Sequence, residues 1–217
     1  MSISAKDVKE LRERTGLGMM ECKKALVECN GNLDEAVTYL RKRSEKKVEK
    51  LSTRIAAEGT VHSYVHGNGR IGVLLELNCE TDFTARNDNF QALAKDIALH
   101  IAAAAPSFLS RDEVQQADLE KEKEIAREKA IAEGKPEKVV DRIVTGKMEK
   151  YYEENVLLEQ KFVKDPKKSV EDLIKETTHN IGEKITLRRF ARYELGEGIE
   201  KREDNFAEEV AKQVAGN

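Results

Sequence analysis

The sequence is poor in several residue types. It contains no tryptophan, three prolines and three cysteines, and aromatic residues make up 5% of its 217 positions. The cysteines (Cys22, Cys29 and Cys79) are odd in number and too few for a disulfide framework, which favours a reducing compartment. There is no run of about 18 apolar residues, and the amino terminus lacks the apolar core of a secretion signal. We therefore expect a cytoplasmic protein that does not enter a membrane.

An excess of charge of one sign is also missing. The 38 Lys and Arg residues nearly balance the 41 Asp and Glu residues, which leaves a formal net charge of −3. Such a chain has no broad basic field of the kind that binds DNA. Charged residues still reach 36% of the sequence, so we expect a helix-rich, highly solvated protein with a modest core.

Motifs of enzyme active sites are absent too. The sequence has no Gly-rich phosphate loop, no zinc-protease motif and no serine-hydrolase elbow. A Cys79 nucleophile with His100 as its base is disfavoured, because the helical pattern puts His100 at a partly exposed position and nothing supplies an oxyanion hole. A metal bound by His62 and His66 is disfavoured because residues i and i+4 of a strand lie about 13 Å apart. We expect a binding protein that is no enzyme and has no cofactor or metal of its own.

Residues 1–43 predict a module of three short helices. Ser4 and Asn32 stand where side chains cap helices, and Asp7 completes an approximate capping box with Ser4. In the second and third helices apolar residues recur at i, i+3, i+4 and i+7, so the helices can close on one another. The module resembles a ubiquitin-associated (UBA) domain, a likeness that many three-helix units share.

Residues 44–58 are dense in charge and almost free of core residues. We interpret them as a solvated linker between domains. Two other interpretations stay open: the run continues the third helix, or its basic side chains contact RNA. Glu45 and Glu49 interrupt the basic patch, which argues against RNA.

Residues 59–200 predict an α+β core domain. Apolar residues alternate with polar ones in 61–65 and again in 71–77, on either side of a Gly-Asn-Gly turn, which indicates an antiparallel β-hairpin. The second strand is apolar on both faces for most of its length, so we expect it to lie inside the sheet. A helical pattern over 90–104 predicts a helix across that sheet. Residues 184–195 alternate again and predict a third strand.

Three further helical segments complete the chain. Residues 118–154 have high helix propensity and few apolar positions around Gly134-Lys135-Pro136, which predicts a projecting antiparallel helical hairpin of coiled-coil type. Ser169 and Asp172 form a capping box that opens another helix. Residues 201–217 predict a carboxyl-terminal helical module that carries Phe206.

Two long segments resemble a known family. LRERTGLGMMECKKAL at 11–26 and ELNCETDF at 76–83 are similar to the two signatures of the elongation factor Ts family. The similarity runs on through LEQKFVKDP, KITLRRFARYELGEGIEK and DNFAEEVAK, and so along the whole chain. One departure is Thr84, where family members commonly carry valine.

The resemblance implies a guanine-nucleotide exchange factor for elongation factor Tu, a GTPase that carries aminoacyl-tRNA to the ribosome. In that family a Thr-Asp-Phe element, here Thr81, Asp82 and Phe83 with Thr84 beside it, pushes into the GTPase and disturbs its magnesium and phosphate site. Magnesium and nucleotide then belong to the partner, so this chain would bind no nucleotide directly.

The resemblance also suggests further contacts with the partner at Arg12, Met19, Met20 and Phe206. Other roles stay open for some of these residues. The two adjacent methionines could fill the core, although only one of them can face inward. Phe83 could plug its own helix, and Asp82 could cap a helix start.

The length of the chain bears on its assembly. Longer family members are said to carry two related halves in the core, and this chain shows one. We therefore expect a homodimer, which would give a two-plus-two complex with elongation factor Tu.

Two other functions remain as alternatives. The first is an RNA- or ribosome-binding translation protein that uses Arg188, Arg189 and Arg192, although these arginines are also typical of the solvated face of a strand. The second is an adaptor that binds ubiquitin through the first module, which the two family signatures oppose.

Overall fold

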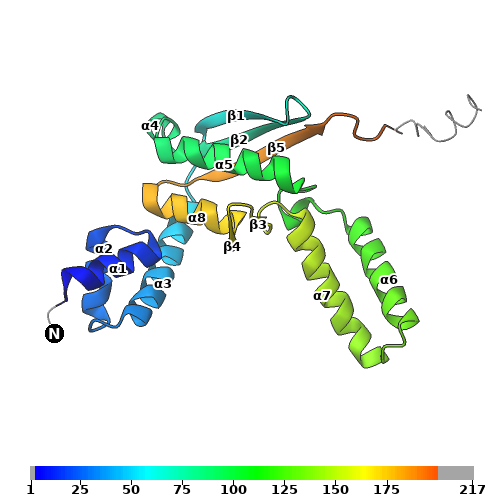
Figure 1. Ribbon diagram of the computed structural model, residues 1–217, viewed down its shortest axis with the longest axis horizontal. Helices are drawn as coiled ribbons and strands as arrows, with labels where there is room; N and C mark the ends of the chain where they lie inside the picture. Colours follow the sequence, from blue (N-terminus) through cyan, green and yellow to red (C-terminus); the bar gives the residue numbers. More distant parts are fainter. Residues whose placement is uncertain (1–2, 200–217) are drawn as a thin grey trace, which may run out of the picture.

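The amino-terminal part of the molecule is a bundle of three helices. In the computed structural model of the protein, which describes residues 3–199, these helices are α1 (Ala5–Thr15), α2 (Met19–Glu28) and α3 (Leu33–Ser52). Their apolar stripes bury a small core of their own, at lower left in Figure 1. The three predicted helices are confirmed; the likeness to a UBA domain stays a prediction.

The predicted helix caps are present as well. The Ser4 hydroxyl accepts a hydrogen bond from the Asp7 amide, and the Asp7 carboxylate accepts one from the Ser4 amide, which completes the capping box. The Asn32 side chain accepts from the first-turn amides of α3. These contacts satisfy amides that have no partner inside a helix, and so fix where α1 and α3 begin.

The charged segment 44–58 is mostly helical. α3 continues through Ser52, which was one of the alternatives open from the sequence, and residues 53–57 connect it to the sheet. Within this segment Leu51 is buried, and the Lys47 Nζ donates a hydrogen bond to the His179 carbonyl oxygen at 2.7 Å. The charged run therefore contributes to the contact between the helical bundle and the rest of the protein.

The core domain contains a three-stranded antiparallel sheet in the order β1-β2-β5, formed by β1 (Glu58–His66), β2 (Ile71–Cys79) and β5 (Thr186–Glu194). The predicted hairpin and third strand are confirmed, and β2 lies between its two neighbours as expected. The described residues cover only one face of β2. Leu75 and Leu77 point into the core, whereas Leu74 on the opposite face is 48% exposed.

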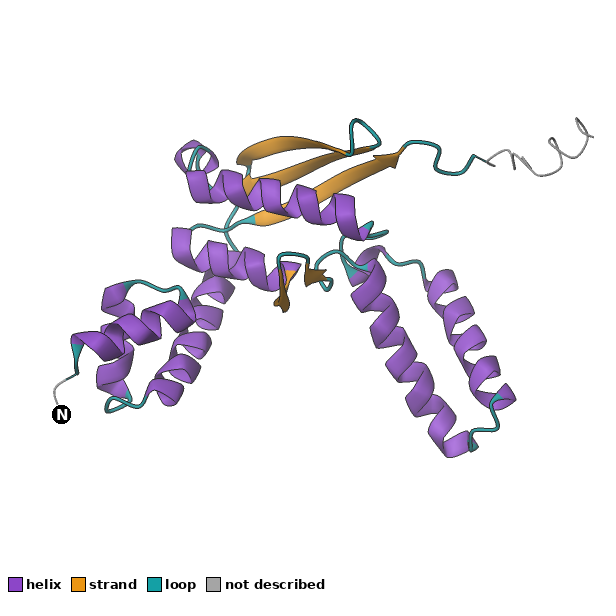
Figure 2. Ribbon diagram, in the orientation of Figure 1, coloured by secondary structure: helices purple, strands orange, loops and turns teal. Residues whose placement is uncertain are grey.

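Helices lie in two layers against the inner face of the sheet. α5 (Asp88–Ala104) lies across it, as predicted, and α8 (Val170–Ile181) lies beneath α5 (Figure 2). The largest fully buried side chain, Phe90, stands in the first turn of α5. The Ser169 capping box at the start of α8 is also confirmed.

His100 is completely buried, so the partly exposed position predicted for it is wrong. Its Nδ1 accepts a hydrogen bond from the Val163 amide, which leaves Nε2 to donate to Oε1 of Gln160 at 2.9 Å. Burial lowers the pKa of His100, which keeps the imidazole neutral. Both ring nitrogens are therefore occupied in tying α5 to the segment after the helical hairpin, and His100 cannot serve as a base for Cys79.

The predicted helical hairpin is formed by α6 (Gln116–Ala132) and α7 (Glu137–Asn155), which run antiparallel and project from the core as an arm (Figure 1). At its base lies the short helix η1 (Arg111–Glu113). The Arg111 guanidinium binds Glu149 and Glu159 and stacks 4.1 Å from the centre of the Tyr152 ring. This one side chain links the start of the arm to its end.

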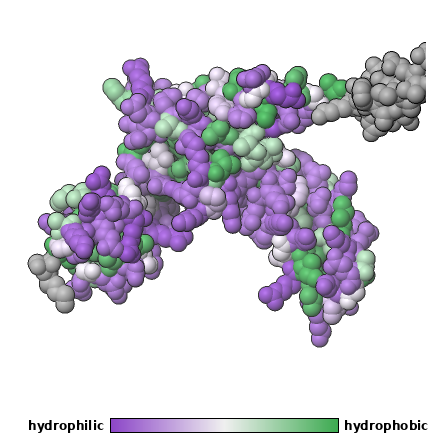
Figure 3. Space-filling model, viewed as in Figure 1, coloured by the Kyte–Doolittle hydropathy of each residue, from purple (hydrophilic) through white to green (hydrophobic). Residues whose placement is uncertain are grey.

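A small hairpin of β3 (Lys161–Phe162) and β4 (Asp165–Ser169) follows the arm and was not predicted. The surface of the helical bundle and of the arm is mostly hydrophilic, with some hydrophobic residues along the arm (Figure 3). None of the described helices is long and apolar enough to cross a membrane. The predicted carboxyl-terminal module, with Phe206, lies outside the described residues.

Candidate functional site

The candidate site is the segment that follows β2. After Cys79 the chain turns into α4 (Asp82–Ala85), a helix of a single turn. Thr81 is its N-cap, and the Thr81 hydroxyl accepts a hydrogen bond from the Thr84 amide at 3.3 Å. The sequence did not predict this turn as a helix, because four residues are too few to show a helical period.

The side chains of α4 divide between the core and the surface. Thr84 and Ala85 are buried, whereas Phe83 is 80% exposed. The interpretation of Phe83 as a plug against its own helix is therefore wrong. A single large apolar side chain is held away from the core on a short, capped turn.

Asp82 is the first residue of α4, but it does not cap the helix. That role falls to Thr81, and the Asp82 carboxylate instead pairs with the Arg86 guanidinium at 3.2 Å. Both side chains are substantially exposed, so this pair contributes little to stability and leaves Asp82 accessible.

The turn is fastened to the core at both ends. At its start the Glu183 carboxylate accepts hydrogen bonds from the Thr81 amide and hydroxyl. At its end the Gln91 side chain donates to the Ala85 carbonyl oxygen at 2.6 Å. Sequence reasoning missed Glu183, which lies 102 positions from Thr81 and carries no local signal of this contact.

Cys79 is a structural thiol at the base of the site. It is fully buried and its Sγ donates to the Thr81 carbonyl oxygen at 3.2 Å. Burial, together with the negative charge of Glu183, raises the pKa of Cys79 to about 11. The thiol is therefore protonated at neutral pH, which makes it a poor nucleophile.

The other candidate contact residues lie on the helical bundle. Met19 and Met20 begin α2 and are 45% and 65% exposed, so neither fills the core and that alternative is wrong for both. Arg12 is also exposed, on α1. The described candidates thus form two separate surfaces, one at the end of β2 and one on the bundle (Figure 1).

Comparison with known proteins shows which family this is. A family model described as "Elongation factor TS" matches residues 4–197. The chain belongs to the elongation factor Ts family. Proteins named elongation factor Ts from Acetivibrio thermocellus and Alkaliphilus oremlandii are 58% and 59% identical to it, over 99% and 100% of this chain and 100% of each relative. The Desulforamulus reducens relative of the same name is 58% identical over 98% of both chains.

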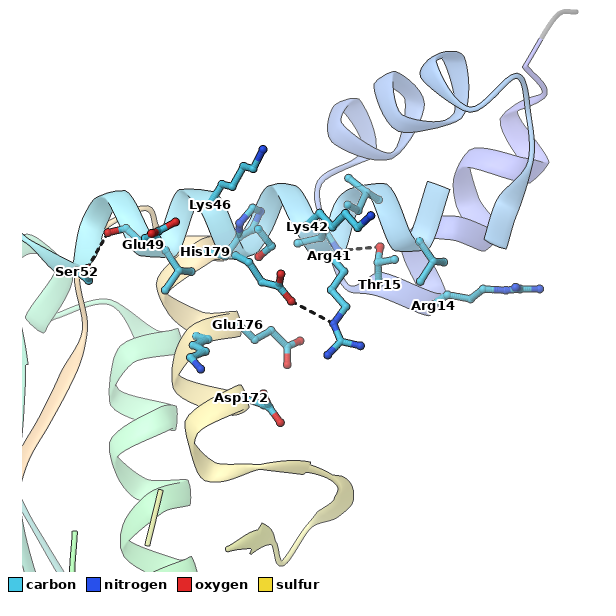
Figure 4. Close-up of a pocket in the computed structure, with 17 residues that line it drawn as sticks. Arg14, Thr15, Arg41, Lys42, Lys46, Glu49, Ser52, Asp172, Glu176 and His179 are labelled. Carbon is cyan, nitrogen blue, oxygen red and sulfur yellow. Dashed lines mark hydrogen bonds and ion pairs between the residues drawn. The ribbon is translucent and has the colours of Figure 1, made fainter. Parts of the chain in front are cut away.

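A groove of about 920 Å³ between α3 and α8 is a second candidate site (Figure 4). Basic residues such as Arg41 and Lys46 and acidic ones such as Glu49 and Glu176 line it together, and Arg41 pairs with Glu45 on its own helix. Small-molecule pockets are mostly apolar with a few convergent polar groups. The mixed charges of this groove are typical of a solvated seam between two packed units.

The arginines that favoured RNA binding are paired within the chain. Arg188 and Arg189 both bind the Glu76 carboxylate, at 2.9 and 2.7 Å, and Arg192 binds Glu194 at 2.7 Å. A β-bulge makes the double contact possible, because the register of β2 and β5 shifts beside Glu76. The hydrogen bond from Arg188 is the main cause of the lowered pKa of Glu76. These carboxylates offset part of the positive charge of the three arginines, which weakens the attraction of this surface for a phosphate backbone.

The exposure of Phe83 predicts how the fold responds to its removal. The Phe83→Ala variant should change the free energy of unfolding by no more than about 0.5 kcal/mol, because the ring makes little contact with the core. The matched Phe90→Ala variant should lose about 3 to 5 kcal/mol, because Phe90 is fully buried. Urea denaturation of both variants measures the difference. Similar losses for the two would show that Phe83 is a core residue after all.

Proposed function

We propose that this protein binds elongation factor Tu in its GDP form in the cytoplasm and promotes the release of GDP. The chain itself makes and breaks no covalent bond. Phe83, with Thr81 and Asp82, enters the GTPase beside its magnesium and phosphate site and displaces the ion. The observation that carries the proposal is an apolar ring 80% exposed on a braced turn, in a member of the elongation factor Ts family.

The physical basis lies in how a GTPase holds its nucleotide. Backbone donors surround the phosphates and Mg²⁺ neutralises their charge, so a small displacement of the elements around the ion would remove a large share of the binding free energy. Phe83 is suited to cause such a displacement because its side chain is large and packs little against the core of its own protein. It gains apolar burial only when a partner surrounds it.

Phe83 alone does not account for the whole effect. Lowering the affinity of the GTPase for GDP about 1000-fold requires roughly 4 kcal/mol. Burial of one phenylalanine contributes only about 1.5 to 3 kcal/mol. We propose that Met19, Met20 and Arg12 supply contacts on the helical bundle. The exposed methionines are apolar and adaptable, which suits them to a partner groove. Thr84 is buried and supports the turn through its backbone amide, a contact that valine would also make.

Thermodynamic linkage sets the order of events. If this protein weakens the binding of GDP by some factor, GDP weakens the binding of this protein by the same factor. The complex with nucleotide-free elongation factor Tu is then the tightest one. Binding of GTP or GDP releases the exchange factor.

We also propose that two copies of the chain associate through the outer face of the sheet. Residues opposite one another in neighbouring strands point to the same face of the sheet. The outer face carries four apolar or aromatic side chains on its three strands: Val61, Val65, Leu74 and Tyr193. These four side chains are 48–74% exposed, and no described helix covers them (Figure 2). An apolar sheet face of this kind is typical of an interface between sheets.

The exchange activity predicts a specific effect of Phe83. The intact protein should greatly accelerate the release of fluorescent GDP from elongation factor Tu. The Phe83→Ala variant should lose about 10- to 100-fold of that acceleration, which corresponds to the burial of one phenylalanine. Stopped-flow fluorescence measures the release rate, and binding of the variant is measured separately by calorimetry.

Ile131→Ala is a matched control for this experiment, because it removes an exposed apolar side chain on the arm. We expect the Ile131→Ala variant to accelerate GDP release from elongation factor Tu as much as the intact protein does. No acceleration by the intact protein would reject the proposed function. Full activity of the Phe83→Ala variant would leave exchange in place but reject the role of Phe83.

The proposed dimer predicts that a charge on the sheet face separates the copies. Intact protein should sediment at twice the mass of one chain, and the Leu74→Lys variant at the mass of a single chain. Val27→Lys is the control, because Val27 is similarly exposed but lies on α2. A single-chain mass for the intact protein across micromolar concentrations would contradict the dimer.

A further inference from the structure

Three hydrogen bonds join the segment after β2 to the segment before β5. The Thr81 amide and hydroxyl donate to the two oxygens of the Glu183 carboxylate, at 3.1 and 2.8 Å. In the reverse direction the Lys184 amide donates to Glu80 Oε1 at 2.6 Å. Residues 80–81 and 183–184 thus hold each other reciprocally, and we call this arrangement the clasp.

Two more hydrogen bonds attach the clasp to Arg54, which lies just after α3. The second oxygen of Glu80 accepts from the Arg54 guanidinium at 3.2 Å, and the Lys184 Nζ donates to the Arg54 carbonyl oxygen at 2.9 Å. The Glu80 side chain is 18% exposed, so solvent screens these contacts only in part. Hydrogen bonds to ionised groups are shorter and stronger than neutral ones. The clasp is therefore a rigid base rather than a loose surface contact.

Thr81 transmits this rigidity to the turn that bears Phe83. Its hydroxyl donates to Glu183 and at the same time accepts from the Thr84 amide, so the carboxylate fixes the orientation in which the hydroxyl caps α4. Phe83 is 80% exposed and is not held by core packing. The backbone of α4 therefore sets the direction in which the Cα–Cβ bond of Phe83 leaves the turn, and Glu183 holds that backbone at its start.

We propose that Glu183 is a positioning residue for Phe83: its carboxylate holds Thr81 so that α4 presents the ring to the partner in one orientation. The consequence for GDP release rests on the proposed function. The effect on the orientation of residue 83 belongs to this chain alone. The two can therefore be tested separately.

The first test needs no partner. The sequence contains no tryptophan, so a Phe83→Trp variant carries a single fluorescent reporter at the site. We expect its fluorescence anisotropy to decay in two phases, a fast one from rotation of the exposed indole about its own side-chain bonds and a slow one from tumbling of the whole protein. Adding Glu183→Gln should enlarge the amplitude of the fast phase, because an amide has a single oxygen to accept from the two Thr81 donors and α4 is then held less firmly. The same decay in both proteins would overturn the proposal.

The second test measures GDP release from elongation factor Tu. The Glu183→Gln variant should lower the maximal release rate about tenfold, the effect of one charge-assisted hydrogen bond, while the half-saturating concentration changes less. Combined with Phe83→Ala it should cause no additional loss, because a ring that is absent needs no positioning. Independent, additive losses would contradict a positioning role.

Glu171→Gln is the matched control, since Glu171 stands on the exposed side of α8 and, among the described residues, its side chain pairs only with Lys175 one turn away. We expect it to behave as the intact protein does in both tests. If the Glu183→Gln variant fails to fold in circular dichroism, Thr81→Val removes the hydroxyl from the same contact and takes its place. Intact protein without exchange activity would reject the proposed function but leave the anisotropy result decisive for Glu183.

Discussion

The antiparallel pairing of β2 with β5 is the constraint on which the site depends. Because the strands run in opposite directions, the end of β2 lies beside the start of β5, and the segments outside the two strands meet there. This is how Thr81 reaches Glu183 across 102 positions of sequence. Gly59 allows the pairing on the other side of β2, since a Cβ at this residue would collide with the Leu77 carbonyl oxygen. The turn that bears Phe83 thus begins where the central strand of the sheet ends.

A division of roles follows from this arrangement. Phe90 at the start of α5 is fully buried and fixes the helix against the sheet, whereas Phe83, seven positions earlier, is exposed on α4. Stability therefore depends on one ring and the proposed exchange activity on the other. A protein that acts by displacing elements of a partner needs this combination. If the apolar ring stood on a flexible loop, the entropy cost of ordering the loop would offset the free energy gained when the ring is buried.

Local patterns in the sequence predicted much of the fold. The helix caps at Ser4 and Ser169 and the hairpin around residues 67–69 depend on neighbouring residues, and each is present. Long-range contacts escaped prediction. No local pattern places Glu183 beside Thr81, and the burial of His100 depends on Gln160, which is 60 positions away. The signatures that carried the resemblance located the Phe83 segment, but the exposure of the ring came only from the structure.

The most direct test of the account is to find where residue 83 lies in the complex. A photoreactive phenylalanine analogue at position 83 should cross-link to the segments of elongation factor Tu that surround its magnesium and phosphates, as mapped by mass spectrometry. The cross-link should disappear when excess Mg²⁺ and GDP are added. The same analogue at Ile131 on the arm should give no cross-link to that region. Cross-links from position 83 only to its own chain, or to a part of elongation factor Tu remote from the nucleotide, would contradict the account.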